Sequence, residues 1–308
     1  MDYPYINALL EKAEKTKKLH DKLSRWSESP SQSEIDKCER AERMIKEALD
    51  VDPKLSKMTI KVFAKGSYAN RTNIPGDSDV DVAVLNEDQF FIDCPPGKTD
   101  SDYNFSSTGY NFTDYFNDVA VAVIRKFGSD SVTVGTKCIT VKSNTSRVEA
   151  DVVPHFKNRR FQSNGVTVDG VAIWTSSGKI QNYPVQDYDN GIIKNADTAK
   201  RYKGFVRIIK NLRSEMMSKK ISSAEKAKSY LISCLVWNVP NELFKGDDYG
   251  FVLRNILNHL ILKTSDASAV SDWGEVNELK YLFTSNQGWT LAEAHKFLID
   301  AKNYLDVI

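Results

Sequence analysis

The chain has 308 residues, of which 41% are hydrophobic, and its 42 basic and 41 acidic side chains leave a formal net charge of +1. A chain of this length can bury one large core or two modest ones. The balanced charge excludes a strong global attraction to nucleic acid or to a membrane surface, so any phosphate binding must be local.

The elements of the first part of the chain mix helix and strand. Apolar side chains at three- and four-residue steps predict helices over 5–25, 32–49 and 113–127. Alternating and β-branched residues predict strands over 58–65, 80–85, 132–142 and 147–153. The polar stretch 86–112 is expected to be a surface excursion, and 161–190 is expected to hold strands and loops, with a turn at 176–184.

From residue 196 onward the pattern is helical. We expect helices over 197–218, 223–238, 248–263, 275–284 and 290–307. Thr290 followed by Glu293 is a capping box that marks the start of the last helix. The sequence therefore predicts an α+β fold in which a catalytic lobe, 1–194, precedes a helical nucleotide-binding lobe, 195–308.

The four cysteines are spread along the chain without a CxxC pair, which argues against both a zinc site and a disulfide framework. The N-terminal stretch MDYPYINALLEKAEK lacks the apolar segment of a signal peptide, and no apolar run approaches the roughly 18 residues of a membrane span. We expect reduced thiols and a cytoplasmic protein with no membrane partner.

The stretch KGSYANRTNIPGDSDVDVAVL, 65–85, concentrates the candidate chemistry. Asp79 and Asp81 lie two positions apart in a predicted strand, so they project from one face while Val80 faces the core. Adjacent carboxylates repel each other, and a divalent cation with oxygen ligands, most obviously Mg²⁺, relieves the repulsion. Asp77, in the loop after Gly76, is expected to tether the turn.

Gly66 and Ser67 predict a phosphate-binding turn on the upstream strand. A glycine lets a phosphate approach the backbone, and a serine hydroxyl with N–H groups at an expected helix N-terminus then binds it. Mg²⁺ usually takes some of its ligands from substrate phosphates, so the two motifs together indicate a nucleotide. Either motif alone would also fit an ordinary loop.

A third carboxylate is expected from the strand RVEADVVPHF. Asp151 lies among apolar neighbours, where an isolated carboxylate is costly without a cation. Glu149 shares its face and is the alternative. Three carboxylates would complete a site for two Mg²⁺ ions, or Mn²⁺ in their place, in which one ion activates an attacking hydroxyl and the other stabilises the leaving group.

These motifs resemble a known family. The blocks GSYANRTNIPGDSDVDVAV, EADVV, NYPV with NGIIKN, RYKGFVRIIKNLR and SYLISCLVWNVPN follow in the order seen in the DNA polymerase β superfamily, and most closely in the CdnE-like clade of the bacterial cGAS/DncV-like nucleotidyltransferases, or CD-NTases. The resemblance implies a two-lobed polymerase β-like fold with a mixed-sheet catalytic lobe. It also implies an enzyme of CBASS anti-phage signalling that joins two or three nucleotides into a cyclic product for a dedicated effector.

The resemblance also implies roles for individual residues. Gly66 and Ser67 would contact the triphosphate, and the three aspartates would bind the metal ions. In the second lobe, Lys210 would hold the donor triphosphate, Ser229 would bond a phosphate and Tyr230 would stack on the donor base. Asn182 corresponds to an asparagine associated with choosing uracil, which favours a cyclic dinucleotide containing UMP.

Three of these residues also have a purely structural interpretation. Lys210 belongs to a basic helical run that would also fit a solvated face, where Lys203 and Arg207 share its side and are rival phosphate ligands. Tyr230 would also fit an apolar core, and Asn182 would also fit a turn before Tyr183.

We therefore expect a template-independent nucleotidyltransferase, acting as a monomer on ATP, UTP or GTP bound between its lobes. The 3′-hydroxyl of one nucleotide, deprotonated with help from Asp151 and Mg²⁺, would attack the α-phosphorus of the other and release pyrophosphate, and a second round would close the ring. An RNA-tailing or CCA-adding transferase is the alternative, disfavoured by the near-zero charge. A sensor without turnover and an aminoglycoside nucleotidyltransferase are disfavoured by the intact carboxylates and by the lack of an acidic cluster in the second lobe.

Overall fold

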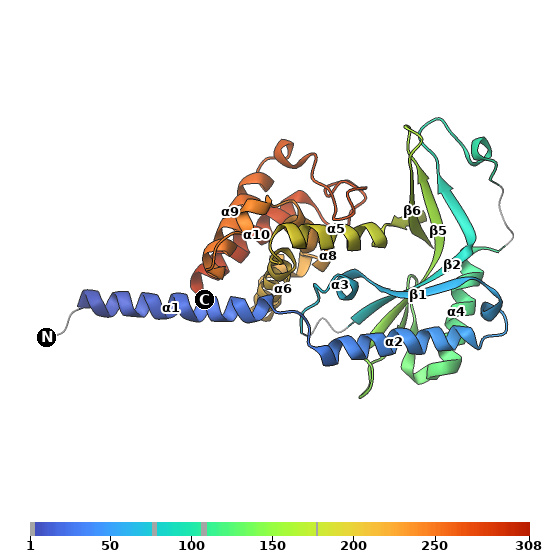
Figure 1. The fold of residues 1–308 in the computed structure, drawn as a ribbon, viewed down its shortest axis with the longest axis horizontal. Coiled ribbons are helices and arrows are strands. Elements are labelled where there is room, and N and C mark those ends of the chain that lie inside the picture. Colours follow the sequence, from blue (N-terminus) through green and yellow to red (C-terminus); the bar gives the residue numbers. More distant parts are fainter. Residues whose placement is uncertain (1–3, 76–78, 106–109, 177) are drawn as a thin grey trace. The chain divides into compact units, whose positions relative to one another are not determined.

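The computed structural model describes residues 4–75, 79–105, 110–176 and 178–308, and the chain divides into two compact units (Figure 1). The sheet unit comprises Pro30–Ala69 and Pro75–Val185. The helical unit comprises Met1–Ser29, Asn70–Ile74 and Gln186–Ile308. These units differ in extent from the predicted lobes, because the first helix and the 70–74 loop pack with the C-terminal helices.

The sheet unit is built on a mixed sheet that has seven strands within the described residues. The strands are β1 (Ile60–Lys65), β2 (Asp79–Asp93), β3 (Val132–Val134), β4 (Ile139–Val141), β5 (Glu149–Phe161), β6 (Thr167–Thr175) and β7 (Gly178–Asn182). Their order is β1-β2-β5-β4-β3, and β6 pairs with both β5 and β7. The β2–β5 pair is parallel, and the other pairs are antiparallel.

Two helices pack in the core of the sheet unit, α2 (Gln32–Asp50) and α4 (Phe112–Phe127). The strands contribute alternate residues to this core, among them Val80, Val82, Ala150 and Val152, which are at most 1% exposed. Each such side chain contributes roughly 1–3 kcal/mol of burial free energy. A slip of one residue would bury the intervening aspartates instead, so the apolar alternation sets the register of β2 and β5.

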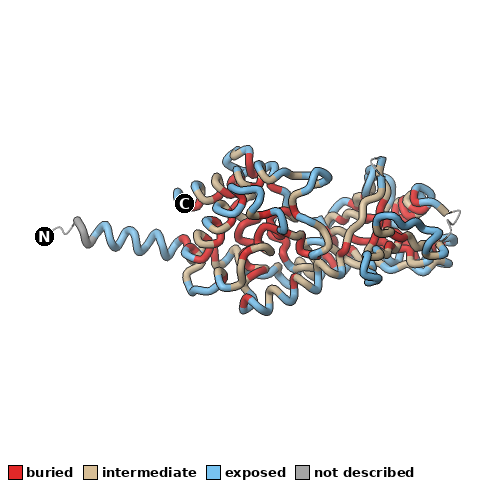
Figure 2. Tube along the Cα trace, turned by 90° about the horizontal axis from the view of Figure 1, so that it is seen from above, coloured by how far each residue is buried: buried red, intermediate tan, exposed pale blue. Residues whose placement is uncertain are grey.

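The helical unit contains α1 (Pro4–Ser27), α5 (Pro184–Asp197), α6 (Tyr202–Ser218), α7 (Ser222–Lys226), α8 (Ser229–Trp237), α9 (Tyr249–Thr264) and α10 (Leu291–Val307). Short 3₁₀ turns lie in the sheet unit at Leu55–Lys57, Asp100–Tyr103 and Ser129–Ser131, and in the helical unit at Asn241–Phe244 and Ser268–Val270. Leu19 and Leu23 of α1 belong to the core of this unit. Figure 2 shows buried segments in both units, so each has a core of its own.

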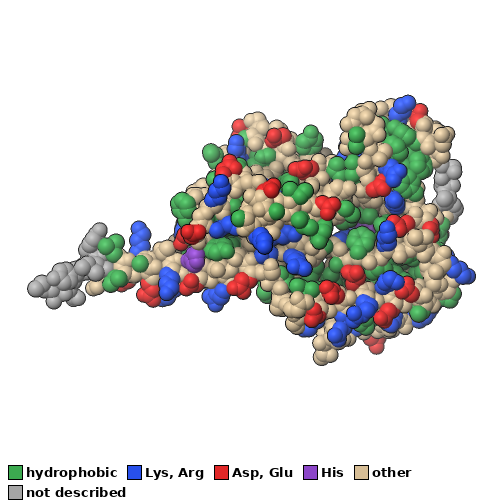
Figure 3. All heavy atoms as spheres, in the orientation of Figure 1, with side chains coloured by type: hydrophobic (Ala, Val, Ile, Leu, Met, Phe, Trp, Pro, Cys, Tyr) green, Lys and Arg blue, Asp and Glu red, His purple; other side chains and the backbone are tan. Residues whose placement is uncertain are grey.

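The mixed α+β class with a helical C-terminal region is confirmed, and so are most predicted elements. The capping box of Thr290 and Glu293 is present at the start of α10. A second capping box, formed by Ser31 and Glu34, starts α2. None of the described helices is both long and apolar enough to cross a membrane. Figure 3 shows basic and acidic side chains interspersed on the face that it presents, in keeping with the balanced charge.

Four predictions about the strands were wrong. The strand predicted over 147–153 is part of β5, which spans Glu149–Phe161. The strand predicted to end at 85 continues to Asp93, because the pairing of β2 with β5 resumes after a register shift between Asn86 and Phe90. The segment 132–142 is a hairpin of β3 and β4, in which the Gly135 amide donates to the Cys138 carbonyl at 2.9 Å. The predicted turn at 176–184 contains β7, which pairs with β6.

The predicted helices at 197–218, 223–238 and 275–284 also need correction. α5 ends at Asp197 and α6 begins at Tyr202, because Ala199 and Lys200 have positive φ values of 50° and 65°. The second segment is two helices, α7 and α8. Residues 275–284 form turns, with an isolated bridge between Gly274 and Tyr281 and a left-handed Glu278.

Candidate active site

Strand pairing aligns four polar side chains across the sheet unit. Lys65 of β1 is the register partner of Asp81 on β2, Asp81 is the partner of Asp151 on β5, and Asp151 is the partner of Thr140 on β4. Register partners project from the same face of a sheet, at Cβ separations of about 5 Å. We call these four residues the carboxylate row.

Asp79 lies two residues before Asp81 and therefore projects from the same face, with Glu149 as its register partner. The intervening Val80 is fully buried, as predicted. Asp79 is exposed, Asp151 is partly exposed, and 44% of the Asp81 side chain is accessible. The carboxylates thus lie on the sheet face opposite the core formed with α2 and α4.

The central carboxylates have specific partners. Lys65 Nζ lies 3.6 Å from Asp81 Oδ1, and Thr140 Oγ1 donates a hydrogen bond of 2.6 Å to Asp151 Oδ1. Burial raises the pKa of the nearby Cys138 thiol, and the charges of Asp151 and Asp81 add to the effect, so the thiol stays protonated. Asp151 is adjacent to Asp81 in the row, and its rival Glu149 is adjacent to Asp79.

The predicted phosphate-binding turn lies directly against this row. Gly66 has φ +67°, and a Cβ at this position would lie 2.7 Å from Asp81 Oδ2. Gly66 therefore serves two requirements at once, a left-handed backbone and a close approach to a carboxylate. Ser67 follows in α3 (Gly66–Ala69), a helix of 4 residues.

The donor chemistry of the row fits a divalent cation such as Mg²⁺. Among the described residues, no three Asp, Glu, His or Cys side chains are gathered closely enough to enclose an ion. Mg²⁺ does not require such an enclosure, since it is usually held by one or two carboxylates, water and substrate phosphates. Asp79, Asp81 and Asp151, which share one accessible face, are the residues that would hold it.

His155 is a buried neutral histidine rather than a base for this site. Its Nδ1 lies 2.6 Å from the Val153 carbonyl oxygen, and burial together with the charge of Lys65 lowers its pKa to about 3. Its imidazole therefore stays uncharged at neutral pH.

In the helical unit, the basic run of α6 is not a solvated face. Lys210 is 1% exposed and Arg207 is 6% exposed. The Arg207 guanidinium donates to the backbone carbonyls of Ser27 and Arg71. Burial lowers the pKa of half-buried Lys203, and the neighbouring Arg71 and Arg207 charges lower it further. Cationic side chains of α6 and of the 70–74 loop therefore lie close together in this unit.

Ser229 and Tyr230 open α8 and both have partners within the helical unit. Arg213 Nη1 donates to Ser229 Oγ at 3.2 Å. The Tyr230 hydroxyl donates to Asp187 Oδ1 at 2.7 Å and lies 3.2 Å from Glu275 Oε2, while Asn277 Nδ2 donates to it at 3.1 Å. The hydroxyl anchors the ring, whose centroid is 6.4 Å from that of Trp289.

Asn182 is the last residue of β7 and the register partner of Val171, so it belongs to a strand rather than to a turn. It is partly exposed and lies in the sheet unit. Asp77 lies outside the described residues. Roles in base selection and in tethering the turn stay predictions for Asn182 and Asp77.

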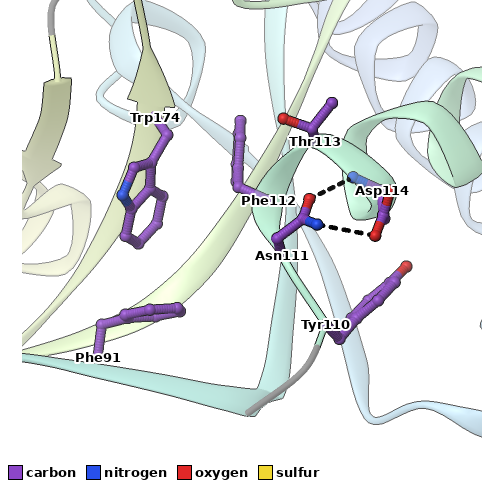
Figure 4. Close-up of a pocket in the computed structure, with 7 residues that line it drawn as sticks. All are labelled: Phe91, Tyr110, Asn111, Phe112, Thr113, Asp114 and Trp174. Carbon is purple, nitrogen blue, oxygen red and sulfur yellow. Dashed lines mark hydrogen bonds between the residues drawn. The ribbon is translucent and has the colours of Figure 1, made fainter. Parts of the chain in front are cut away.

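A separate pocket of about 430 Å³ lies toward the far end of β2 (Figure 4). Aromatic rings of Phe91, Phe112 and Trp174 face it, together with the start of α4, where the Asn111 side chain bonds Asp114. It contains none of the predicted site residues.

Two members of the carboxylate row, Lys65 and Thr140, were not predicted. A lysine before the GS pair and a threonine in a short strand carry no motif. The signal that identifies them is the strand register, which brings together residues from β1, β2, β4 and β5.

Family models match most of the chain. The model of the Second Messenger Oligonucleotide or Dinucleotide Synthetase domain matches residues 17–170, and that of the cGAS/DncV-like nucleotidyltransferase C-terminal helical domain matches residues 189–306.

Two curated relatives are cyclic dipyrimidine nucleotide synthases named CdnE. The protein of Cecembia lonarensis is 40% identical over 93% of this chain and 98% of its own length, and that of Legionella pneumophila is 38% identical over 91% and 96%. The solved structure of the Rhodothermus marinus CdnE c-UMP-AMP synthase with Apcpp and Upnpp has a TM-score of 0.80, with 29% identity over 93% of this chain and 94% of that one. The chain therefore belongs to the cGAS/DncV-like nucleotidyltransferases, in their CdnE-like clade, and is a nucleotidyltransferase of the cyclic dinucleotide synthase type.

Proposed function

We propose that the chain converts two nucleoside triphosphates, at least one of them UTP, into a cyclic dinucleotide in CBASS anti-phage signalling, without a nucleic-acid template. The observation that carries the chemistry is the register pairing of Asp81 with Asp151 beside Gly66. It aligns two carboxylates on the face of the sheet where Asp79 also projects, next to the turn proposed to contact phosphate.

The proposed residue roles follow from the positions of these groups. Asp79, Asp81 and Asp151 would hold two divalent cations, which supply charge neutralisation at the triphosphate and activation of the attacking hydroxyl. The Gly66 backbone and the Ser67 hydroxyl would contact the triphosphate. Asp151 would help remove the proton of the 3′-hydroxyl, and Thr140 would keep that carboxylate oriented.

The helical unit would supply the remaining nucleotide contacts. Lys210 would bind the donor triphosphate, with Lys203 as a second cation on α6, and Ser229 would bond a phosphate. The Tyr230 ring would stack on the donor base, since its hydroxyl is already anchored by Asp187.

The choice of a pyrimidine rests on two supports. Two of the curated relatives, at 40% and 38% identity, are named dipyrimidine synthases, and Asn182 offers an amide that can donate to a pyrimidine carbonyl and accept from the ring N–H. We propose that Asn182 contacts the uracil edge. The product would then be read by a dedicated CBASS effector.

The test is incubation of the purified protein with all four NTPs and Mg²⁺, without RNA, followed by phosphatase treatment and mass spectrometry. We expect a phosphatase-resistant cyclic dinucleotide that contains UMP, together with pyrophosphate. Extension of added RNA without a cyclic product would instead support a tailing enzyme. Binding of NTPs without pyrophosphate release would support a sensor.

A matched pair of variants on β2 tests the carboxylates. Asp81→Asn should lower product formation by about a thousandfold, since catalysis of phosphoryl transfer depends on charge neutralisation at the triphosphate. Asp93 lies at the other end of β2 and is paired with Lys179, Gln181 and Asn158. Asp93→Asn should cost stability and leave the turnover of the folded protein unchanged. Equal activity of the two variants would contradict the assignment.

A further inference from the structure

Lys65 has an unusual position for a lysine on a strand at the end of a sheet. It is the last residue of β1, its side chain is only 19% exposed, and its amine approaches Asp81, with Nζ 3.6 Å from Oδ1. By contrast, Lys61 of the same strand is 65% exposed in its pair with Glu87. Lys65 thus supplies a positive charge at the carboxylates themselves.

Thr140 approaches the row from the other side. It lies on β4, next to β5, and its hydroxyl donates a short hydrogen bond of 2.6 Å to Asp151 Oδ1. A hydroxyl that donates to a carboxylate restricts the side-chain rotamers of both residues. Groups that bond a ligand in this way commonly orient it for its cation.

The two flanking residues should affect a bound cation in opposite directions. The ammonium of Lys65 repels a cation and competes with it for Asp81, so it has to be displaced when the cation binds. The hydroxyl of Thr140 is neutral, and it removes rotamer freedom that Asp151 would otherwise lose on binding.

We propose that Lys65 and Thr140 are positioning residues of the carboxylate row: Lys65 neutralises Asp81 until a divalent cation displaces it, and Thr140 orients Asp151 to receive that cation. The inference rests on the proposed function, since it takes the three aspartates as cation ligands. It adds a reason why these carboxylates remain adjacent and ordered before substrate arrives.

The test is a titration of the full chain with Mn²⁺ alone, without nucleotide, in which dissociation constants are measured by calorimetry. Thr140→Val should weaken Mn²⁺ binding by about tenfold or more, as for other groups that orient metal ligands. Thr140→Ser should restore binding to within about twofold of the unsubstituted chain, because it keeps the hydroxyl. Lys65→Met should tighten binding by about two- to fivefold, the range of a partly exposed ion pair.

Two controls isolate these effects. Thr133, on β3, is the register partner of Thr140 one strand further from the aspartates, so Thr133→Val tests the loss of a strand threonine alone. Lys61→Met removes a lysine of β1 that pairs with Glu87. Both controls should bind Mn²⁺ like the unsubstituted chain, and circular dichroism with thermal unfolding should show that every variant is folded.

The proposal is overturned if folded Thr140→Val binds Mn²⁺ normally, or if Lys65→Met binds it more weakly than the unsubstituted chain. Failure of the proposed function gives a different result, in which the unsubstituted chain forms no cyclic product, or Asp81→Asn retains both Mn²⁺ binding and cyclic product. If Asp81→Asn loses both while Thr140→Val and Lys65→Met match the unsubstituted chain, the proposed function stands and this inference alone fails.

Discussion

Carboxylate pairs occur in both units, and their surroundings differ. In the sheet unit, Asp79 and Asp81 are accessible, and Lys65 Nζ lies 3.6 Å from Asp81 Oδ1. In the helical unit, Glu275 is 5% exposed and accepts hydrogen bonds from Asn277 and Gln287, while Asp187 accepts one from Tyr230. Buried carboxylates that accept several hydrogen bonds stabilise the fold, whereas accessible carboxylates that share one sheet face are candidates for binding a ligand.

After that of Asp81→Asn, the largest effect should come from adding a methyl group to the turn beside Asp79 and Asp81. Gly66→Ala places a Cβ 2.7 Å from Asp81 Oδ2, so the carboxylate must move. We expect the turnover rate to fall by about 100-fold or more, since displacement of a catalytic group by about 1 Å has effects of that size. The left-handed backbone should also cost about 1–2 kcal/mol of stability.

Gly128→Ala is the control for this variant, because Gly128 has φ +84° and no neighbouring atom lies within 4 Å of the place that the added methyl group would occupy. It should lose similar stability at an unchanged rate. Equal losses of rate in both variants would mean that backbone strain, rather than Asp81, is responsible.

The carboxylate pair of the helical unit, Asp187 and Glu275, should make the stability of the protein depend on pH. Burial, opposed by the Tyr230 hydrogen bond and reinforced by the Glu275 charge, raises the pKa of Asp187 from 3.8 to about 6. The folded state therefore holds this proton to a higher pH than the unfolded state does, so its contribution is complete below pH 3.8 and is lost as the pH rises through about 6. Asparagine does not titrate, so in Asp187→Asn the free energy of unfolding should decrease over this pH range by up to about 3 kcal/mol less than in the unsubstituted chain.

The measurement is urea unfolding between pH 4 and pH 7, with Asp189→Asn on the exposed side of the same helix as control. If the difference between Asp187→Asn and the unsubstituted chain stays constant over this range, the Asp187 proton does not contribute to stability.

The same comparison, between a residue proposed to bind a ligand and a residue that stabilises the fold, can be made for the cations of α6. Lys210→Met should raise the KM for NTPs by about tenfold or more, the value of a charge-assisted bond to phosphate. Arg207→Met removes donors from the Ser27 and Arg71 carbonyls and should instead lower the free energy of unfolding by about 1–3 kcal/mol. A Lys210→Met protein that loses stability but keeps its KM would place Lys210 among the structural cations.

The smallest effect is expected from Tyr230→Phe. This change removes one donor from Asp187 and should cost about 1 kcal/mol of stability, while the ring that is proposed to stack on the base remains. Tyr230→Leu also removes the ring and should weaken nucleotide binding by about tenfold, as expected for loss of a stacking partner. Equal nucleotide affinity of the two variants, measured by calorimetry, would exclude stacking.

The placement of Asp79, Asp81 and Asp151 on strands was predictable because their signal is local. A polar residue every second position beside buried valines specifies a strand and its two faces within a few residues. The extent of β2 beyond Leu85 was not predictable from that pattern, because the polar residues 87–89 interrupt the pairing with β5, which resumes at Phe90 after a register shift. Likewise, the left-handed Glu278 stops a helix that composition alone would allow.

The residues that contact Asp81 and Asp151 could not be predicted from neighbouring positions in the sequence. Lys65 and Thr140 come from separate strands, and only the pairing of β1 with β2 and of β4 with β5 brings them to the row. The burial of Lys210 was similarly missed, since a basic run on a helix usually faces solvent and the packing of α6 depends on helices distant in sequence. The motif residues could thus be placed on their strands from the sequence, whereas their neighbours Lys65 and Thr140 could not be predicted.

The parallel pairing of β2 with β5 has a consequence for hydrogen exchange. The backbone that carries Asp81 and Asp151 lies in the interior of the sheet, with β1 and β4 on either side, so its amides should exchange only when the sheet unit unfolds as a whole. The adjacent Gly66–Ala69 helix has 4 residues, and so short a turn should open locally at far lower cost. The aspartates would then stay in place while the turn that we propose to contact phosphate adjusts to each incoming nucleotide.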